Sequence, residues 1–222
     1  MSSYLTATKG RRIALVLAAA VISLSACSSS ETAGELVSQP TPNPVINEAE
    51  QDSGDRDPEL LALMEEVNLD PCPTPAVNPD AAIPGLPDQV FECLGDTSAI
   101  SLAQIRGKPL IVNVWASWCP PCIEELPLLN KVSRELKGQV DFIGINIEDD
   151  STKALQLMQD FDISYPSVID RSGDTRAPLL IPGPPVTYFV TAEGVVAGRW
   201  DGAIPNETTF NSLLKKNLGI TR

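Results

Sequence analysis

Two cysteines stand two residues apart, directly after an apolar run, in the stretch VNVWASWCPPCIEELP, Val112–Pro127. The run itself, residues 110–116, is rich in valine and isoleucine, a pattern typical of a buried strand. A helix is expected from about Pro120 to Leu136, because proline fits the first helical turn, where its missing N–H leaves no bond unmade. Cys119 and Cys122 therefore lie where a buried strand ends and a helix begins, and this junction constrains both fold and chemistry.

The start of a helix changes how a cysteine reacts. Unpaired N–H groups and the helix dipole favour negative charge there, which lowers the pKa of the first cysteine and makes it a thiolate near neutral pH. The second cysteine would sit one turn inside the helix, close enough to displace a mixed disulfide. We therefore expect Cys119 to attack and Cys122 to resolve, with Trp118 and Trp115 flanking the site as an apolar surface.

Other interpretations of the CxxC pair are weaker. A structural zinc site needs a second pair of ligands at similar spacing, and the chain has no histidine and no second CxxC. The lack of histidine also excludes Ser-His and Cys-His catalysis. A structural disulfide in a binding module stays open as an alternative. Redox chemistry is the favoured interpretation, and it requires no metal and no bound organic cofactor.

The N-terminus has the pattern of an export signal. Lys9, Arg11 and Arg12 form a basic start, and the apolar stretch that follows is too short for a comfortable transmembrane helix. The stretch ends in LSAC, Leu24–Cys27, which resembles the lipobox of bacterial lipoproteins, where the cysteine is acylated. We expect residues 1–26 to be a lipoprotein signal peptide and Cys27 to carry the lipid. The alternative is an ordinary signal peptide with a chance cysteine.

Residues 27–57 differ in composition from the rest of the chain. They contain few large apolar side chains and many polar, proline and acidic ones, so burial cannot offset the entropy of folding. We expect a flexible acidic tether, followed by a folded domain at 58–222 with an N-terminal extension at 58–100 and a core at about 101–218. The net charge of −13 argues against nucleic acid as a partner, because its phosphates require lysine and arginine.

Strand and helix patterns alternate through the folded part. A β-α-β half followed by a ββα half, with the CxxC after the first core strand, is a thioredoxin-like layout. It predicts an α/β fold in which helices flank a central mixed sheet. The expected elements are a helix at about 58–68, a short strand in QVFECLG, a helical turn capped by Ser101, strands at 139–147 and 165–170, a helix at 151–161, a hairpin at 186–200 that turns at 192–194, and a last helix capped by Asn206 and ended by Gly219.

Two longer motifs carry a family resemblance. GKPLIVNVWASWC, continued by PPCIEELP, and the later PPVTYFVTAEGVV resemble the membrane-anchored, extracytoplasmic thioredoxin-like proteins of the TlpA and ResA type, over about residues 88–217. That family includes reductases of cytochrome c maturation. The resemblance implies a lipid-anchored thiol:disulfide oxidoreductase on the extracytoplasmic face of a bacterial membrane. Its expected partners are the thiols and disulfides of exported proteins and a membrane electron donor or acceptor, and we expect it to be a monomer.

The resemblance also assigns roles to residues around the cysteines. The family's Trp-Cys-x-x-Cys matches Trp118, Cys119 and Cys122, so Trp118 is expected to contact substrate. Its acidic residue one turn past the second cysteine matches Glu125, and its helix-kinking proline matches Pro127, which in any helix interrupts a hydrogen bond.

Asn113 departs from cytosolic thioredoxins, which keep a buried aspartate six residues before the first cysteine. An amide cannot accept a proton, so the general-base role would pass to Glu125. A solvated helix residue is the alternative for Glu125, and we expect the neighbouring Glu124 to be one.

Two prolines end the loop before the strand at 186. The resemblance places a cis-proline at Pro185, facing the cysteines and positioning substrate, and a plain loop proline is the alternative. In such proteins the residue before the cis-proline pairs its backbone with the bound substrate. Here that residue is Pro184, which keeps its carbonyl but has no N–H. We therefore expect a narrower substrate range than that of a general thioredoxin.

Cys72 and Cys93 flank a Pro-rich stretch. In an oxidising compartment a structural disulfide is the simplest account, and closing a loop of about 20 residues contributes on the order of 3 kcal/mol. A pair that relays electrons to the CxxC is the alternative, although neither cysteine has an activating neighbourhood.

The direction of the reaction is open from the sequence. The resemblance favours a reductant that serves apocytochrome c or another exported client. An oxidant that inserts disulfides into exported proteins is the main alternative, and a binding module with an inert CxxC is a weaker one.

Overall fold

The computed structural model describes residues 58–74 and 86–222 of the chain. The expected signal peptide, the tether and the lipidation site at Cys27 lie outside the described residues. Within the described part, no helix has both the length and the apolar character needed to cross a membrane.

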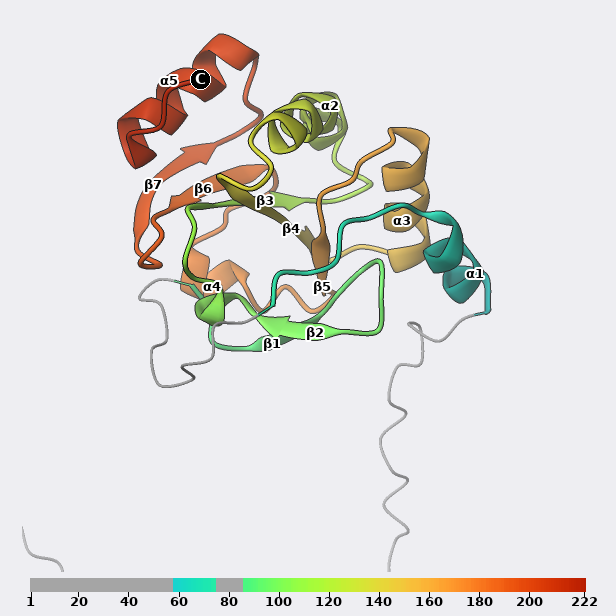
Figure 1. Cartoon of the computed structure of the whole chain (residues 1–222). Helices are drawn as coiled ribbons and strands as arrows, with labels where there is room; N and C mark the ends of the chain where they lie inside the picture. Colours follow the sequence, from blue (N-terminus) through green and yellow to red (C-terminus); the bar gives the residue numbers. More distant parts are fainter. Residues whose placement is uncertain (1–57, 75–85) are drawn as a thin grey trace, which may run out of the picture. The chain divides into compact units, whose positions relative to one another are not determined.

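A five-stranded sheet with the order β5-β4-β3-β6-β7 lies at the centre of the fold (Figure 1). β3 pairs with β4, and β4 with β5, in parallel, whereas β6 pairs with β3 and β7 in antiparallel fashion. The sheet is therefore mixed, as predicted. The strands are β3 Leu110–Trp115, β4 Asp141–Ile147, β5 Ser167–Asp170, β6 Val186–Val190 and β7 Val196–Asp201.

The middle strand, β3, is covered on both faces, and all of its residues are buried. Side chains alternate along a strand, so Ile111 and Trp115 join one hydrophobic cluster while Leu110, Val112 and Val114 join the other. Because both faces of β3 are buried, its sequence is almost continuously apolar and does not alternate between apolar and polar residues.

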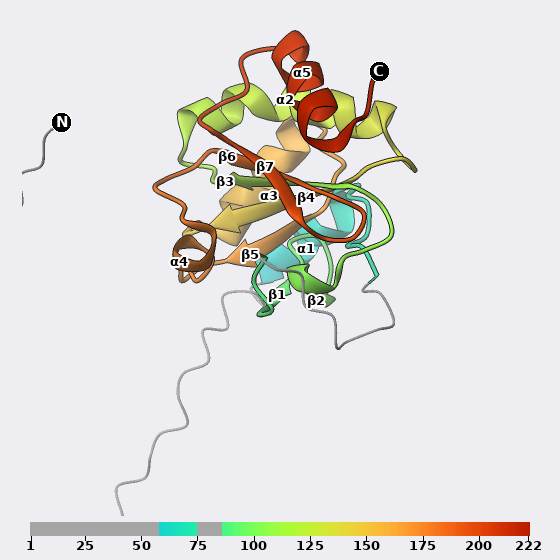
Figure 2. The same cartoon turned by 90° about the vertical axis from the view of Figure 1, so that its left-hand side faces the viewer.

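Longer helices cover one face of the sheet. α2 (Pro120–Glu135), α3 (Ser151–Asp160) and α5 (Glu207–Leu218) contribute buried apolar side chains to a single cluster. α1 (Pro58–Glu66) adds Leu60 to this cluster and packs against α3 (Figure 1; Figure 2). The first helix of the N-terminal extension therefore completes the hydrophobic core.

Smaller elements cover the other face. β1 pairs with β2 as an antiparallel ribbon, and a bridge between Cys93 and Val168 connects this ribbon to β5. The sequence did not predict β2 or α4, because each is too short to show a periodic pattern. The elements on this face are β1 Val90–Glu92, β2 Ala99–Ser101, the 3-10 turn η2 Leu102–Gln104 and α4 Arg176–Leu179.

The predicted cap of the turn after residue 101 is wrong. Ser101 does precede η2, but its side chain makes no capping bond. Its hydroxyl donates instead to Asp88 Oδ1 at 3.3 Å. Ser101 is the last residue of β2, so the strand sets the direction of its side chain.

The C-terminal elements follow their sequence patterns. β6 and β7 form the predicted hairpin, and Gly194 in its turn has a φ of 93°, which glycine adopts without strain. Asn206 Oδ1 accepts the Thr209 N–H at 2.9 Å, and Gly219 ends α5 in the left-handed conformation. The predicted hairpin and both predicted helix ends are confirmed.

Candidate active site

Loops from four strands meet at one edge of the sheet. β3, β4 and β5 are parallel, so the segments that follow them leave from the same edge. β6 runs in the opposite direction, so the segment that precedes it arrives there. The register pairs Val114 with Val186, which places Pro185 beside the strand end that leads to Cys119. The topology therefore brings the cysteines and the proline loop together.

The two cysteines form a disulfide at the start of α2. Their Sγ atoms are 2.06 Å apart, and Cys119 is the N-cap residue of the helix. Cys119 is 3% exposed and Cys122 is fully buried. Cys119 is therefore the less completely buried residue of the pair.

Prolines at the first two helical positions limit the hydrogen bonds that the Cys119 sulfur can accept. Pro120 and Pro121 have no N–H, so Cys122 supplies the first backbone donor of the helix. Cys122 N lies 3.3 Å from Cys119 Sγ. This bond and the positive end of the helix dipole would stabilise a thiolate at Cys119.

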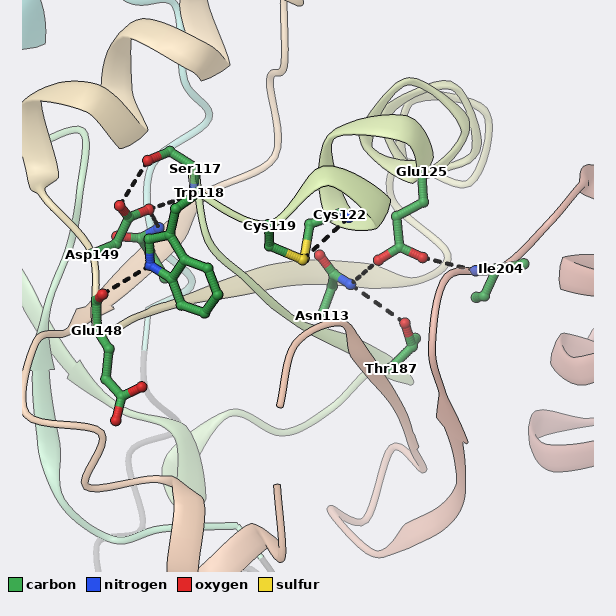
Figure 3. The surroundings of a disulfide bond; sticks show 11 residues. Asn113, Ser117, Trp118, Cys119, Cys122, Glu125, Glu148, Asp149, Thr187 and Ile204 are labelled. Carbon is green, nitrogen blue, oxygen red and sulfur yellow. Dashed lines mark hydrogen bonds between the residues drawn. A yellow bond between two sulfur atoms is a disulfide. The ribbon is translucent and has the colours of Figure 1, made fainter. Parts of the chain in front are cut away.

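Glu125 is buried on the other side of the disulfide from Trp118 (Figure 3). Its Oε1 accepts from Asn113 Nδ2 at 2.9 Å, and its Oε2 accepts from the Ile204 N–H at 2.8 Å. Burial raises the pKa of the Glu125 carboxyl from 4.5 to about 7, against the lowering effect of these two bonds. Glu125 is therefore not a solvated helix residue, and its carboxyl can take up and release a proton near neutral pH.

Asn113 contributes more than its sequence position suggested. Its Nδ2 lies 3.4 Å from Thr187 Oγ1 in addition to its bond with Glu125. Asn113 Oδ1 is buried and has no hydrogen-bond partner among the residues that the structure describes. The amide thus holds the Glu125 carboxylate in place from β3.

The two tryptophans do not form a common surface. Trp118 is 52% exposed, and its Nε1 donates to the Glu148 carbonyl at 2.9 Å. Trp115 is fully buried, and its Nε1 donates to Ser167 Oγ at 3.1 Å. The expectation for Trp115 is therefore wrong, because it is the last residue of β3 and points into the core.

Sequence reasoning missed Asp149, which holds the segment just before the cysteines. Asp149 Oδ1 accepts from the Ser117 hydroxyl at 2.7 Å, and Oδ2 accepts from the Ser117 N–H at 2.5 Å (Figure 3). Asn146 Nδ2 also donates to Oδ2, at 2.7 Å. Asp149 follows β4, so only the pairing of β3 with β4 could have revealed this contact.

The peptide bond between Pro184 and Pro185 is cis. Pro185 is buried and its carbonyl accepts the Gly202 N–H at 2.9 Å, so this residue is fixed to the start of β6. Pro184 is half-buried, and its carbonyl has no hydrogen-bond partner among the described residues.

Cys72 and Cys93 form a second disulfide, with a Cα–Cα distance of 6.5 Å. Cys93 is 3% exposed and Cys72 is half-buried. The bond attaches the segment after α1 to the β1–β2 ribbon. Within residues 58–74 and 86–222, no group of three or more histidine, cysteine or acidic side chains is placed to hold a metal ion.

Curated relatives are similar in sequence to the folded domain of this chain. The thiol:disulfide interchange protein DsbE of Pseudomonas fluorescens biotype C is 40% identical over 118 residues, which are 53% of this chain and 65% of that protein. The thiol-disulfide oxidoreductase ResA of Oceanobacillus iheyensis is 27% identical over 110 residues, 49% of this chain and 57% of that protein. The chain thus spans less than two thirds of the length of either relative.

Solved structures and a family match agree with the architecture. A thiol:disulfide interchange protein of the thioredoxin family from Chlorobium tepidum TLS aligns with a TM-score of 0.52 and 27% identity, over 68% of this chain and 99% of that one. The predicted thioredoxin-like α/β fold is confirmed. The sequence model of the Redoxin family matches residues 77–213, which is more than half of the chain. The chain belongs to the Redoxin family.

Proposed function

We propose that this chain is an extracytoplasmic thiol:disulfide oxidoreductase whose reacting group is the Cys119–Cys122 pair. The observation that carries the proposal is the placement of this pair. Cys119 caps α2 and is 3% exposed, Cys122 is fully buried, and a buried carboxyl with a pKa of about 7 lies one turn further along the helix. A structural disulfide needs neither an accessible sulfur nor a proton acceptor.

The reaction runs as two thiol–disulfide exchanges. In the reducing direction, the Cys119 thiolate attacks one sulfur of a client disulfide, and the other client sulfur leaves as a thiolate. Cys122 then loses its proton and attacks the Cys119 sulfur of the mixed disulfide. The second client sulfur leaves, two electrons have passed to the client, and the chain holds its own disulfide. The oxidising direction reverses each step.

Glu125 is the proposed proton carrier for Cys122. It stands one turn past Cys122 on α2 and is the buried carboxyl of the site. With a pKa of about 7, the carboxylate can accept the Cys122 proton as the second exchange begins and return it afterwards.

The proposed substrate contacts lie on the two loops beside the cysteines. Trp118 offers an exposed apolar face, and Pro185 lies at the start of β6, beside the end of β3 that leads to Cys119. Pro184 has no N–H, and its carbonyl has no partner in the part of the chain that the structure describes, so a client chain pairs with it by one backbone hydrogen bond where another residue would allow two. Client proteins that make apolar contacts with Trp118 would bind, whereas peptides that depend on backbone hydrogen bonds alone would bind weakly.

We further propose that lipid on Cys27 attaches the protein to the outer face of a bacterial cytoplasmic membrane, with residues 28–57 as a tether. The lipobox-like LSAC after a basic and apolar leader supports this placement. The relatives named interchange proteins and oxidoreductase support exported protein thiols as clients. The proposed direction is reduction of a client such as apocytochrome c, with electrons supplied by a membrane donor.

Cysteine variants of the full chain test the chemistry. The reduced protein is mixed with glutathione disulfide, and adducts are read by mass spectrometry. We expect Cys119→Ser to form no adduct in the peptide that carries Cys122, and Cys122→Ser to accumulate a mixed disulfide between Cys119 and glutathione, because its second exchange is blocked. The double variant Cys72→Ser/Cys93→Ser serves as the control and keeps the exchange. A wild-type chain that does not react would instead favour a binding module with an inert disulfide.

A further inference from the structure

The segment Leu179–Pro182, which leads to Pro184 and Pro185, is held by two arginine side chains. Arg199 Nη1 donates to its first two carbonyls, at 3.3 and 3.0 Å. Arg176 Nη1 donates to its last two carbonyls, at 3.4 and 3.3 Å. Every carbonyl of this segment therefore accepts a hydrogen bond from an arginine.

Each arginine is in turn held by a carboxylate. Arg176 Nε donates to Glu148 Oε1 at 2.9 Å, and its Nη2 donates to Glu148 Oε2. Arg199 Nε donates to Asp201 Oδ1 at 2.8 Å. The side chains of Arg176 and Arg199 are only 30% and 27% exposed. A guanidinium held in this way presents its remaining donors in a fixed fork, which an ammonium cannot do.

Glu148 connects the segment Leu179–Pro182 to Trp118 through two contacts. Its carboxylate binds Arg176 while its carbonyl accepts the indole N–H of Trp118 at 2.9 Å. Its φ is 49°, an uncommon value for a residue other than glycine, which persists only where the surroundings fix it. Leu180, whose carbonyl Arg199 binds, has a φ of 55° and is 75% exposed. Glu148 and Leu180 therefore both have a positive φ, and each of them accepts a hydrogen bond from an arginine side chain.

We propose that Arg176 and Arg199 are positioning residues that fix the loop before Pro184 and Pro185, and so determine how well a protein substrate fits the site. The inference rests on the proposed function. A protein substrate must lie against this loop and Trp118 while its disulfide meets Cys119. Glutathione disulfide is small and has only to reach the Cys119 sulfur. Loosening the loop therefore slows exchange with proteins more than exchange with glutathione disulfide.

The test compares two substrates on the full chain. The reduced protein reacts with insulin or with glutathione disulfide, and the exposed Trp118 beside Cys119 reports oxidation by fluorescence. The variants are Arg176→Lys and Arg199→Lys, which keep the charge and lose the fork. The matched control is Arg134→Lys, because Arg134 also binds a carboxylate and a carbonyl, both of Asp162, but lies near the far end of α2. We expect the ratio of the insulin rate to the glutathione rate to fall about two- to fivefold in each loop variant and to stay unchanged in the control.

The outcomes separate the two proposals. An unchanged ratio, or equal losses with both substrates, overturns the role of the arginines while leaving the redox function intact. A wild-type chain that does not react with glutathione disulfide overturns the proposed function. If a lysine variant does not fold, Glu148→Gln and Asp201→Asn release the same arginines from their carboxylate side, and the same fall in the ratio is expected.

Discussion

Burial of the Glu125 carboxyl gives the site a group that can bind and release a proton near neutral pH. The residue is 2% exposed, and its pKa is raised to about 7. The family resemblance located Glu125 one turn past Cys122, but its burial depends on the segment at Ile204, 79 residues later in the chain. A periodic pattern on one helix cannot report a contact at that separation.

Replacing Glu125 by glutamine removes the proposed proton carrier with little change of shape. We expect Glu125→Gln to slow the exchange of the reduced protein with glutathione disulfide about a hundredfold near pH 7, the low end of what a positioned acid or base contributes. The rate of the variant should also lose the titration that the wild type shows near pH 7. The matched control is Glu124→Gln at the neighbouring position, which should keep both the rate and the titration. Equal pH profiles for wild type and Glu125→Gln would exclude Glu125 as the carrier.

The same raised pKa predicts how stability depends on pH in the oxidised protein. A carboxyl whose folded pKa lies above its unfolded value stabilises the fold below the unfolded pKa, and this contribution is lost as pH rises through the folded pKa. For Glu125 the window runs from 4.5 to about 7, and the loss amounts to about 3 kcal/mol. Urea unfolding across this window should show a decline in the wild type that Glu125→Gln lacks. Parallel curves would contradict the raised pKa.

Pro184 is predicted to restrict which chains bind. Pro184→Thr adds an N–H beside a carbonyl that has no hydrogen-bond partner among residues 58–74 and 86–222, so a client can form a second backbone hydrogen bond. With Cys122→Ser in both backgrounds to hold mixed disulfides, the Pro184→Thr background should trap more partner proteins, and in larger amounts. Pro71→Thr, at an exposed proline of the extension, is the control. An identical set of trapped proteins in the two backgrounds would contradict a restricting role for Pro184.

Several important residues were out of reach of sequence reasoning. Asp149 holds Ser117, and Arg176 and Arg199 hold the proline loop, yet each looks like an ordinary surface charge in the sequence. Trp115 looked like its neighbour Trp118 but belongs to the core. These assignments depend on how segments fold back on one another, and a periodic pattern along the sequence does not show that.

At the scale of elements, local patterns predicted most of the fold. The apolar run of β3, the hairpin of β6 and β7, and the capped helix α5 each carry their own signal within a few residues. The ribbon of β1 and β2 is different, because three-residue strands gain their structure from tertiary contacts. The disulfide between Cys72 and Cys93 and the bridge to Val168 are among those contacts.

Removing the Cys72–Cys93 disulfide tests whether it serves the fold or the chemistry. The double variant Cys72→Ser/Cys93→Ser should lower the free energy of unfolding by about 3 kcal/mol, because the unfolded chain gains the entropy of an open loop. Its exchange with glutathione disulfide should match the wild type, since this pair lies at the β1–β2 ribbon and not at the start of α2. Slower exchange with unchanged stability would favour the electron relay instead.

At the scale of the whole molecule, the fold gathers the reacting groups at one sheet edge and leaves α1 of the N-terminal extension packed on α3. This arrangement suits a redox domain that presents a single face to its clients. Membrane attachment through Cys27 would keep that domain close to a donor of electrons. The direction of electron flow then depends on one property of the assembled site, its reduction potential.

The reduction potential of the Cys119–Cys122 pair decides whether the protein acts as a reductant or as an oxidant. The full chain is equilibrated with defined ratios of reduced and oxidised glutathione, and the thiols are counted by alkylation. We predict a potential near or below about −230 mV, which makes the protein a reductant that depends on a supply of electrons. A potential near about −120 mV would make it a disulfide donor and contradict the proposed direction, and a pair that never equilibrates with glutathione would contradict the redox function itself.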